Sequence, residues 1–286
     1  MTLLDRVLDC NNATLNDFIP LCVRGQTVGW VSEEFSHRLL QEAPLIIREN
    51  GSIVIQGGDR DYDALSSAVD EALFRIYSRD NHGFGKWCGE RTPVVAAMGQ
   101  QPLFEVERAA LPTLGIISNG VHLNGFVGEG ADLSMWVSRR GAHLASQPNL
   151  LDQIVAGFLP VGGSTMDKLC EEADEEAGIP QELMRMAQPT GGVTFLQLTD
   201  VGVRKGFVFT YDLRLPSDFV PHNKDGEVGE FLLLKPREVL DMLASGPCFK
   251  FDSALVAIDF MMRRGFVPPE HNEYATIVTG LRGVGV

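Results

Sequence analysis

Apolar runs separated by turn residues fill the first part of the chain. Arg24-Gly25-Gln26-Thr27 interrupts one apolar stretch, and Asn50-Gly51 interrupts a second stretch that is rich in β-branched residues. Asn-Gly is typical of a tight hairpin turn, because both residues tolerate a positive φ. The pattern therefore predicts two β-hairpins, one within residues 18–31 and one within residues 45–55.

Two helices are predicted around these hairpins. Ser32 can cap a helix that runs to about residue 41. Over residues 62–77, apolar side chains recur at the spacing of an amphipathic helix. These apolar positions are Leu65, Val69, Ala72, Leu73 and Ile76. Residues 1–110 are therefore predicted to form a small α/β module, in which no pattern indicates catalysis.

The rest of the chain, residues 111–286, is predicted to be a second domain. Glycine and proline punctuate residues 80–112, which favours a boundary near residue 110. Strand-like segments follow at residues 115–127, 133–137, 193–198 and 206–213. Two short helices are expected between the second and third of these segments, and a final helix over residues 253–264. The pattern predicts an α/β (α+β) domain with a helical segment at its end.

The most informative window is residues 156–179. Ser164 can cap a helix over residues 165–177, and Gly178 follows its last turn, where a left-handed residue is typical. Glu172, Glu175 and Glu176 fall on one stripe of this helix. The neighbouring stripe is apolar and would pack on a sheet. It consists of Met166, Leu169, Cys170, Ala173 and Ala177.

Three carboxylates within one helical turn repel one another, at a cost of a few tenths of a kcal/mol per pair on an exposed helix. A hard divalent cation offsets that repulsion, since Mg²⁺ prefers oxygen ligands and is commonly held by one or two carboxylates together with the phosphates of a substrate. Glu172, Glu175 and Glu176 are therefore candidate metal ligands. The alternative interpretation is a solvated acidic helix face, which is the usual role of a charge run.

Charge excludes several classes of partner. The sequence has 24 basic and 38 acidic residues, a net charge of −14 and a pI near 4.8. A general binder of nucleic-acid polymers or of anionic membranes would need positive charge that this chain lacks. We therefore expect a small-molecule partner, while nothing in the pattern sets the oligomeric state.

The cysteines and the N-terminal residues bear on the compartment. Five cysteines without close pairs fit neither a disulfide framework nor a zinc site; they are Cys10, Cys22, Cys88, Cys170 and Cys248. Acidic residues interrupt the N-terminal segment before an apolar signal core is reached, and no apolar stretch is long enough to span a membrane. We expect reduced thiols and a cytosolic protein.

The window around the acidic helix resembles the Nudix box, G-x5-E-x7-R-E-U-x-E-E-x-G-U, where U is aliphatic. Gly157 takes the first glycine, Glu172 the glutamate after the arginine position, Glu175-Glu176 the acidic pair and Gly178-Ile179 the end. In the Nudix family these glutamates bind divalent metal ions and the substrate is an organic diphosphate. The resemblance implies an α/β/α sandwich with a mixed sheet, and it favours Mg²⁺ as the cofactor, with Mn²⁺ as the alternative.

Two positions depart from the box. Gly163 stands at the position of the first glutamate, and Glu171 stands at the position of the arginine. The family's arginine helps to orient the acidic cluster, whereas an acid adds repulsion. These departures keep open a catalytically weak module that binds a diphosphate without cleaving it.

A narrower resemblance extends over nearly the whole chain. The segments G-V-H-L-N-G at residues 120–125, L-D-Q-I-V-A-G at residues 151–157 and D-G-E-V at residues 225–228 are similar to a Nudix branch related to fungal thiamine pyrophosphokinases. In that branch a Nudix domain follows an N-terminal module, which Val28-Gly29-Trp30 resembles here. The resemblance implies cleavage of thiamine diphosphate or its oxidised derivatives to a monophosphate and phosphate. Other Nudix substrates, namely ADP-ribose, a nucleotide sugar or a dinucleotide, are the alternative.

The resemblance also assigns roles to single residues. Glu175 is our candidate for the base that activates water, and Glu172 is the second catalytic candidate, although the roles of the glutamates can exchange. Glu227 is a candidate further metal ligand or base, because many Nudix proteins draw an acid from a loop after the box. Glu230 is its rival, and an ordinary turn at Asp225-Gly226 is the alternative.

Four residues are candidates for contact with the substrate. Arg139 and Arg140 can bind phosphate oxygens in a bidentate manner, although a solvated strand end explains them equally well. Trp136 can stack on an aromatic ring, and Gly157 is expected beside the substrate as the first glycine of the box. His122 lies in an apolar strand and is interpreted as a structural histidine.

Overall fold

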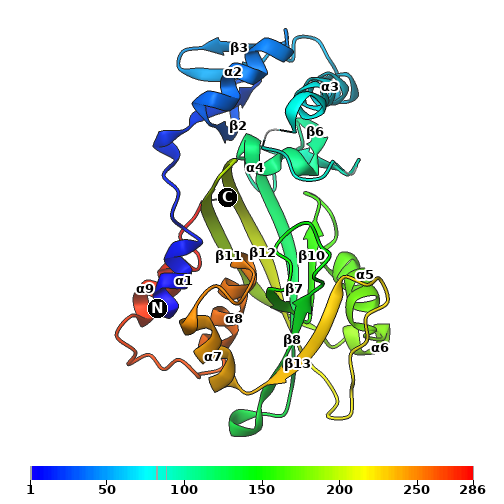
Figure 1. Cartoon of the computed structure of the whole chain (residues 1–286), viewed down its shortest axis with the longest axis vertical. Coiled ribbons are helices and arrows are strands. Elements are labelled where there is room, and N and C mark those ends of the chain that lie inside the picture. Colours follow the sequence, from blue (N-terminus) through cyan, green and yellow to red (C-terminus); the bar gives the residue numbers. More distant parts are fainter. Residues whose placement is uncertain (1, 82, 88, 286) are drawn as a thin grey trace.

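The computed structural model describes residues 2–81, 83–87 and 89–285. Its upper part in Figure 1 is built on a four-stranded sheet in the order β2-β1-β4-β3, with a two-stranded sheet of β5 and β6 beside it. Helices α2 and α3 pack on one another. The elements are β1 (Ile19–Val23), β2 (Gln26–Val31), α2 (Glu33–Glu42), β3 (Ile46–Glu49), β4 (Ser52–Ile55), α3 (Tyr62–Asp80), β5 (Arg91–Val94) and β6 (Phe104–Glu107).

Local sequence rules explain these elements, and the two hairpins and two helices predicted here are confirmed. Asn50 and Gly51 adopt φ values of 48° and 80° at the β3–β4 turn, which glycine adopts without strain. Ser32 accepts a hydrogen bond from the Phe35 amide (3.1 Å) and so caps α2. The predicted apolar stripe of α3 is buried, since Leu65 and Ile76 are at most 2 % exposed.

The lower part contains a mixed seven-stranded sheet. Strands β11-β12-β7-β8-β13 follow one another in this order, β10 pairs with β7, and β9 pairs with β8. Only β12 and β7 among these pairs are parallel. The strands are β7 (Ile117–Val127), β8 (Ser134–Arg140), β9 (Leu151–Gln153), β10 (Val155–Leu159), β11 (Gln188–Thr199), β12 (Gly202–Arg214) and β13 (Val228–Leu234).

Helices cover both faces of this sheet, as the predicted sandwich requires. Helices α5 and α6 lie on one side, while α1, α7, α8 and α9 lie on the other (Figure 1). Each side has its own buried apolar core. The helices are α1 (Leu3–Asp9), α5 (Thr165–Ala177), α6 (Gln181–Met184), α7 (Pro236–Ser245), α8 (Phe251–Arg263) and α9 (Tyr274–Gly280). Burial of both faces of a mixed sheet confirms the predicted α/β class.

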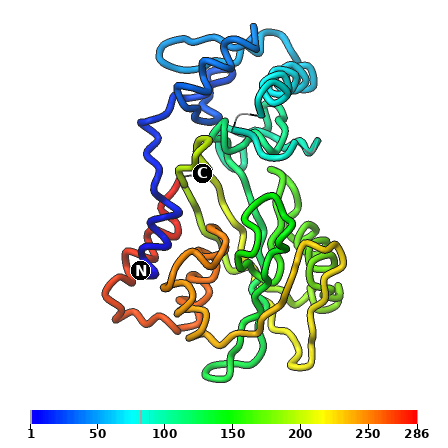
Figure 2. Tube along the Cα trace, viewed as in Figure 1, coloured from blue at the N-terminus to red at the C-terminus, as the bar shows by residue number. Residues whose placement is uncertain are grey.

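Helix α1 comes before the upper part in the chain but packs in the lower part. Its side chains Leu3 and Val7 are buried in the same apolar core as α8 and α9. From α1 the chain rises to the upper part and returns to β7 through the short helix α4 (Leu111–Leu114), as Figure 2 shows. The predicted division into residues 1–110 and 111–286 stays a prediction.

Three differences from the predicted elements concern short segments. Strands β9 and β10 are separated only by Ile154, and they form because β8 and β7 each offer a free edge. The predicted helix over residues 253–264 is present as α8, but α9 follows it. Helix α7 has ten residues and was not predicted. Segments this short carry little periodicity, so packing on the larger elements decides them.

Four of the cysteines are free thiols, namely Cys10, Cys22, Cys170 and Cys248. Cys88 lies outside the described residues. Among the helices of the described residues, none combines the length and the apolar character needed to cross a bilayer.

Candidate active site

Helix α5 carries the acidic cluster, and its ends form as the sequence predicts. Ser164 accepts a hydrogen bond from the Asp167 amide (3.2 Å) at the start of the helix. Gly178, with a φ of 60°, ends it by donating to carbonyls of the last turn. Leu169, Ala173 and Ala177 are fully buried against β7 and β10. The predicted apolar stripe therefore fixes which side of α5 faces away from the sheet.

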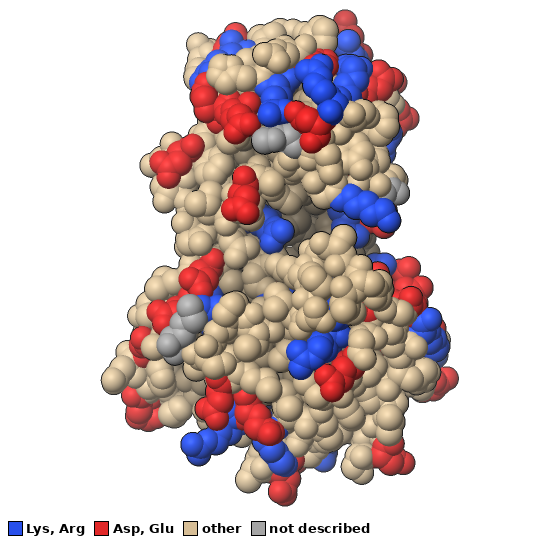
Figure 3. Space-filling model, viewed as in Figure 1, with Lys and Arg blue, Asp and Glu red and all other residues tan. Residues whose placement is uncertain are grey.

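The three candidate metal ligands of α5, Glu172, Glu175 and Glu176, line one cavity of about 720 Å³, as does Glu171. Glu176 is buried, the Glu172 side chain is 16 % exposed, and Glu175 is exposed to solvent. The cavity continues over β10 onto the sheet and reaches the upper part of the molecule. The space-filling view shows a hollow between the upper and lower parts, with basic side chains at its edge (Figure 3). The acidic stripe thus opens onto a space that can hold a small molecule.

Glu176 is held at the edge of β10. Its Oε2 atom accepts a hydrogen bond from the Ala156 amide (2.8 Å). Burial raises the pKa of Glu176 well above its ordinary value, and repulsion from Glu172 and Asp152 raises it further. A desolvated carboxylate in this environment is stabilised by any cation that reaches it.

Glu172 packs directly against the box glycine. A Cβ atom on Gly157 would lie 2.5 Å from the Glu172 Cγ atom, so a larger residue cannot fit without moving this glutamate. Burial raises the pKa of Glu172, and repulsion from Glu175 and Glu171 adds to the shift. Gly157 therefore sets the position of Glu172 in addition to lining the cavity.

Lys168 provides a positive charge that the Nudix box arginine would otherwise provide. Its Nζ atom lies 2.8 Å from Glu172 and 3.2 Å from Glu171. Glu171, at the arginine position, is largely exposed and shares this lysine instead of facing Glu172 alone. The ion pair with Lys168 lowers the pKa of Glu172 and so opposes burial, which raises it. Lys168, one helical turn earlier, thus partly offsets the repulsion that Glu171 adds.

The donor set fits a hard divalent cation. Among the described residues, no group of three or more His, Cys, Asp or Glu side chains is already arranged to hold a metal ion. Mg²⁺ does not require such a cage, because it keeps several waters and takes only one or two carboxylates besides the phosphates of the substrate. Glu172 and Glu176, two desolvated carboxylates that repel one another, would hold it. Glu175 and Glu227 are the exposed acids that line the same cavity.

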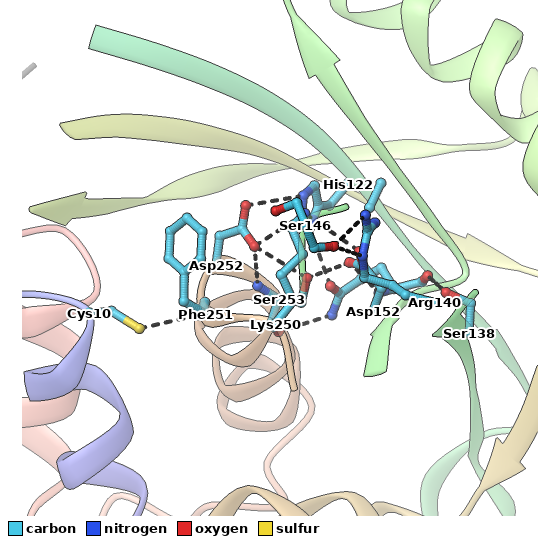
Figure 4. A network of polar contacts seen from close by, with 12 residues as sticks. Cys10, His122, Ser138, Arg140, Ser146, Asp152, Lys250, Phe251, Asp252 and Ser253 are labelled. Carbon is cyan, nitrogen blue, oxygen red and sulfur yellow. Dashed lines mark hydrogen bonds and ion pairs between the residues drawn. The ribbon is translucent and has the colours of Figure 1, made fainter. Parts of the chain in front are cut away.

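A buried polar network forms another part of the cavity wall (Figure 4). Lys250, at the start of α8, lies 3.5 Å from Asp152 and 3.3 Å from Asp252. Arg140 also pairs with Asp152 (3.4 Å), and burial lowers the pKa of His122, which points toward Asp252. His122 contacts Gln153 (3.2 Å). The network ties β7, β8 and β9 to α8.

The upper part of the molecule also contributes to the cavity. Arg108 lies over the ring of Phe158 on β10, 4.4 Å from its centroid, and donates to Glu90 (2.7 Å). Glu90, Arg91 and Arg108 all line the cavity. No sequence pattern indicates a catalytic role in this half, because Arg108, in the short 3-10 helix after β6, becomes notable only when the fold brings it to β10.

The structure places the predicted site residues in two groups. Six line the cavity, namely Glu172, Glu175, Glu176, Glu227, Arg140 and Gly157. Arg139 and Trp136 do not line it. Arg139 donates to Glu230 (3.0 Å), the rival of Glu227, and to the Asn149 carbonyl (3.1 Å). Trp136 packs against the apolar core on the α5 side of the sheet.

Comparison with known proteins identifies the family. Residues 2–118 match the model "Domain of unknown function (DUF4743)". The whole chain is similar to "Nudix hydrolase 20, chloroplastic" of Arabidopsis thaliana, with 31% identity over 97% of this chain and 77% of that protein. It belongs to the Nudix hydrolase family. The same plant's "Nudix hydrolase 24, chloroplastic" is also 31% identical, over 98% of this chain and 77% of that protein.

As a Nudix hydrolase, the protein acts on diphosphate bonds. Nudix hydrolases generally use divalent metal ions, and small molecules are their substrates. A solved structure, DR0079 from Deinococcus radiodurans, is 21% identical with a TM-score of 0.45 and covers 59% of this chain and 98% of that chain. The resemblance to the Nudix branch related to fungal thiamine pyrophosphokinases and the cytosolic location stay predictions.

Proposed function

We propose that this Nudix hydrolase uses Mg²⁺, with Mn²⁺ as the alternative ion, to cleave an organic diphosphate into a monophosphate and phosphate. The observation that carries the proposal is the shared cavity, where Glu172, Glu175 and Glu176 of α5 meet several cationic side chains. The carboxylates suit a metal ion, while Arg140 and Lys168 suit phosphate oxygens. A diphosphate needs both kinds of partner.

The residues of the cavity can divide the reaction among them. A bound divalent ion would neutralise charge on the phosphates as the P–O bond breaks. Glu172 and Glu176, the desolvated pair, would hold that ion. Glu175 is exposed to water and takes the proton of the attacking water molecule. Glu227, from the loop before β13, is a further acid at the same cavity.

Thiamine diphosphate or its oxidised derivatives are the substrates that we propose. The resemblance of residues 120–125, 151–157 and 225–228 to the thiamine-related branch supports this class. The cavity also contains aromatic side chains that can pack on the rings of such a substrate, namely Phe158, Phe195 and Phe251.

Cleavage of a panel of diphosphates, with the phosphate and monophosphate products resolved by chromatography, tests the proposal. The panel contains thiamine diphosphate, its oxidised analogues, ADP-ribose, a nucleotide sugar and NADH, each with Mg²⁺ and with excess EDTA. We expect metal-dependent release from the thiamine compounds. Cleavage of ADP-ribose, the nucleotide sugar or NADH alone, which gives two monophosphates and no free phosphate, would keep diphosphate hydrolysis and overturn the proposed substrate. Ligand-induced thermal stabilisation without any cleavage would indicate the diphosphate-binding module that Gly163 and Glu171 favour.

Substitution of one glutamate tests the assigned metal site. Glu172→Gln should reduce turnover by two orders of magnitude or more, roughly the loss expected when a charge-stabilising group is removed. Asp174→Asn, on the exposed side of the same helix, is the matched control and should retain activity. Nearly normal turnover in Glu172→Gln, measured as phosphate release, would contradict the assignment.

A further inference from the structure

Arg204 differs from the other cationic side chains of the cavity, because it has no charged partner among the described residues, whereas each of the others is paired with a carboxylate. It lies on β12, and its side chain lines the cavity on the same face of the sheet as Val208, because alternate residues of a strand share a face. The guanidinium carbon lies 5.2 Å from the ring centroid of Phe251, at the start of α8. Phe251 and Phe195 pack edge to face, with their centroids 5.1 Å apart. Arg204 therefore rests on an aromatic support at the floor of the cavity.

Other partly buried arginines of the lower part are paired. Arg140 pairs with Asp152 (3.4 Å), Arg263 with Asp212 (2.7 Å), and Arg264 with Asp212 (2.8 Å). Within the described residues, the Arg204 guanidinium makes neither an ion pair nor a hydrogen bond. Burial lowers the pKa of Arg204, and the charge of Asp252 acts on it only at longer range. A partly desolvated cation without a partner is costly, so an anion that enters the cavity gains by meeting it.

The carboxylates of the polar network beside Arg204 are already paired with other cations. Lys250 is shared between Asp152 and Asp252, and Arg140 is paired with Asp152. Together with Arg204, this makes three cations and two carboxylates. Burial keeps His122 neutral by lowering its pKa, so it does not change the balance. Glu176 also lines the cavity and interacts with Lys250 and Asp152, so Arg204 is the cation of this network that no carboxylate pairs with directly among the described residues.

We propose that Arg204 binds a phosphate group of the substrate directly, as an anion-binding site distinct from the metal-binding glutamates of α5. This inference rests on the proposed function. A planar guanidinium matches phosphate oxygens with two parallel N–H donors, and Phe251 supports the plane from one side. The cavity therefore recognises phosphate in two ways, through a divalent ion at the carboxylates and through a guanidinium on the sheet.

The first test uses inorganic phosphate in EDTA, so that neither metal nor turnover is needed. Phosphate should raise the melting temperature of the wild-type protein. Arg204→Gln should lose that rise, and without phosphate it should be at least as stable as the wild type. Arg214→Gln is the matched control, since Arg214 is an exposed residue of the same strand that pairs with Glu129. It should keep the rise.

Two results would overturn the proposal. One is an equal phosphate-induced rise in Arg204→Gln, or none in the wild type. The other is an Arg204→Gln protein that is less stable than the wild type without phosphate, because Arg204 would then be a structural residue.

Arg204→Lys keeps the charge but not the paired donors, and it should retain only part of the rise in melting temperature.

Kinetics with a hydrolysed diphosphate give a second readout. Arg204→Gln should raise KM about tenfold or more while kcat changes less, since a contact made in the ground state as well as the transition state acts mainly on KM. A kcat loss with unchanged KM would contradict the assigned role. If the wild-type protein cleaves no diphosphate, the proposed function fails, but the phosphate experiment in EDTA still decides the role of Arg204.

Discussion

At the scale of single residues, the site is a compromise between stability and chemistry. Glu176 is buried and Glu172 is half-buried beside it, and burial raises the pKa of both. Arg204 is held on an aromatic ring without a carboxylate partner. Buried charges that lack a partner in the free protein destabilise it and become favourable when a ligand of opposite charge binds. Functional sites are where such arrangements collect.

Glu176→Gln is a direct test of this compromise. The amide oxygen can still accept the Ala156 hydrogen bond, while the buried charge and its repulsion from Glu172 are removed. We expect the free energy of unfolding in EDTA to rise, on the order of 1 kcal/mol, while metal-dependent turnover is lost. Chemical denaturation and phosphate release measure the two effects. A less stable variant would contradict the view that Glu176 is destabilising without a cation.

The residue scale also shows what the sequence alone could predict. Ser32, Asn50-Gly51, Ser164 and Gly178 act through neighbours in the chain, so local rules placed the hairpins and helix ends correctly. Arg204, by contrast, becomes notable only because β12 and α8 come together. No spacing in the sequence shows that an arginine lacks a partner.

At the scale of elements, the decisive feature is that β7 changes partners along its length. Its first half pairs with β10, from Asn119 to Leu123, and its end pairs with β8 at Phe126 and Val127. The polar network of Figure 4 lies where these strands meet the start of α8. Two contacts join three elements there. Nδ1 of His122, on β7, contacts the side-chain oxygen of Gln153, on β9, and Nε2 of Gln153 donates to the carbonyl of Ser253, on α8.

This network predicts a pH dependence of stability. Burial and the charge of Lys250 lower the pKa of His122, opposed by Asp252 and Asp152. The unfolded chain binds a proton below a pH of about 6.5, whereas the folded protein does not until a lower pH. This histidine therefore lowers stability as the pH falls below about 6.5, with a slope of at most about 1.4 kcal/mol per pH unit.

His122→Gln isolates that contribution from the other titrating groups. The difference in unfolding free energy between the wild type and the variant should become smaller or reverse as the pH falls from 8 to 5. Urea denaturation at several pH values measures it. A difference that stays constant over this range would show that His122 is not the responsible group.

At the scale of the whole molecule, the upper part is a wall of the active site. Arg108 crosses from it to Phe158 on β10, and Lys205 on β12 lies over the ring of Trp30, 4.7 Å from its centroid. Phe158 follows Gly157, which packs on Glu172. The upper part thus reaches Glu172, a candidate metal ligand, through Phe158 and Gly157, and lies in position to select substrates.

Arg108→Ala should therefore change substrate binding from outside the Nudix box. Loss of the contact with Phe158 removes about 0.5–1 kcal/mol of cation–π interaction and opens that wall of the cavity. We expect KM to rise several-fold for the substrate found in the panel, with a smaller change in kcat. Arg48→Ala, an exposed residue of the same part that pairs with Glu33, is the control. Equal KM values in the two variants would contradict a role for this wall.

Helix α1 has a consequence for how the protein is made. Cys10, which ends α1, donates to the carbonyl of Phe251, 241 residues further along the chain. During synthesis on a ribosome, the sheet of β1 to β4 can close from residues that emerge together. Helix α1 must wait for α8 and α9 with its apolar side exposed. Contacts of such long sequence separation form slowly. The helical layer of α1, α8 and α9, which covers the sheet on the side of Arg204, is therefore the last part of the protein to be completed.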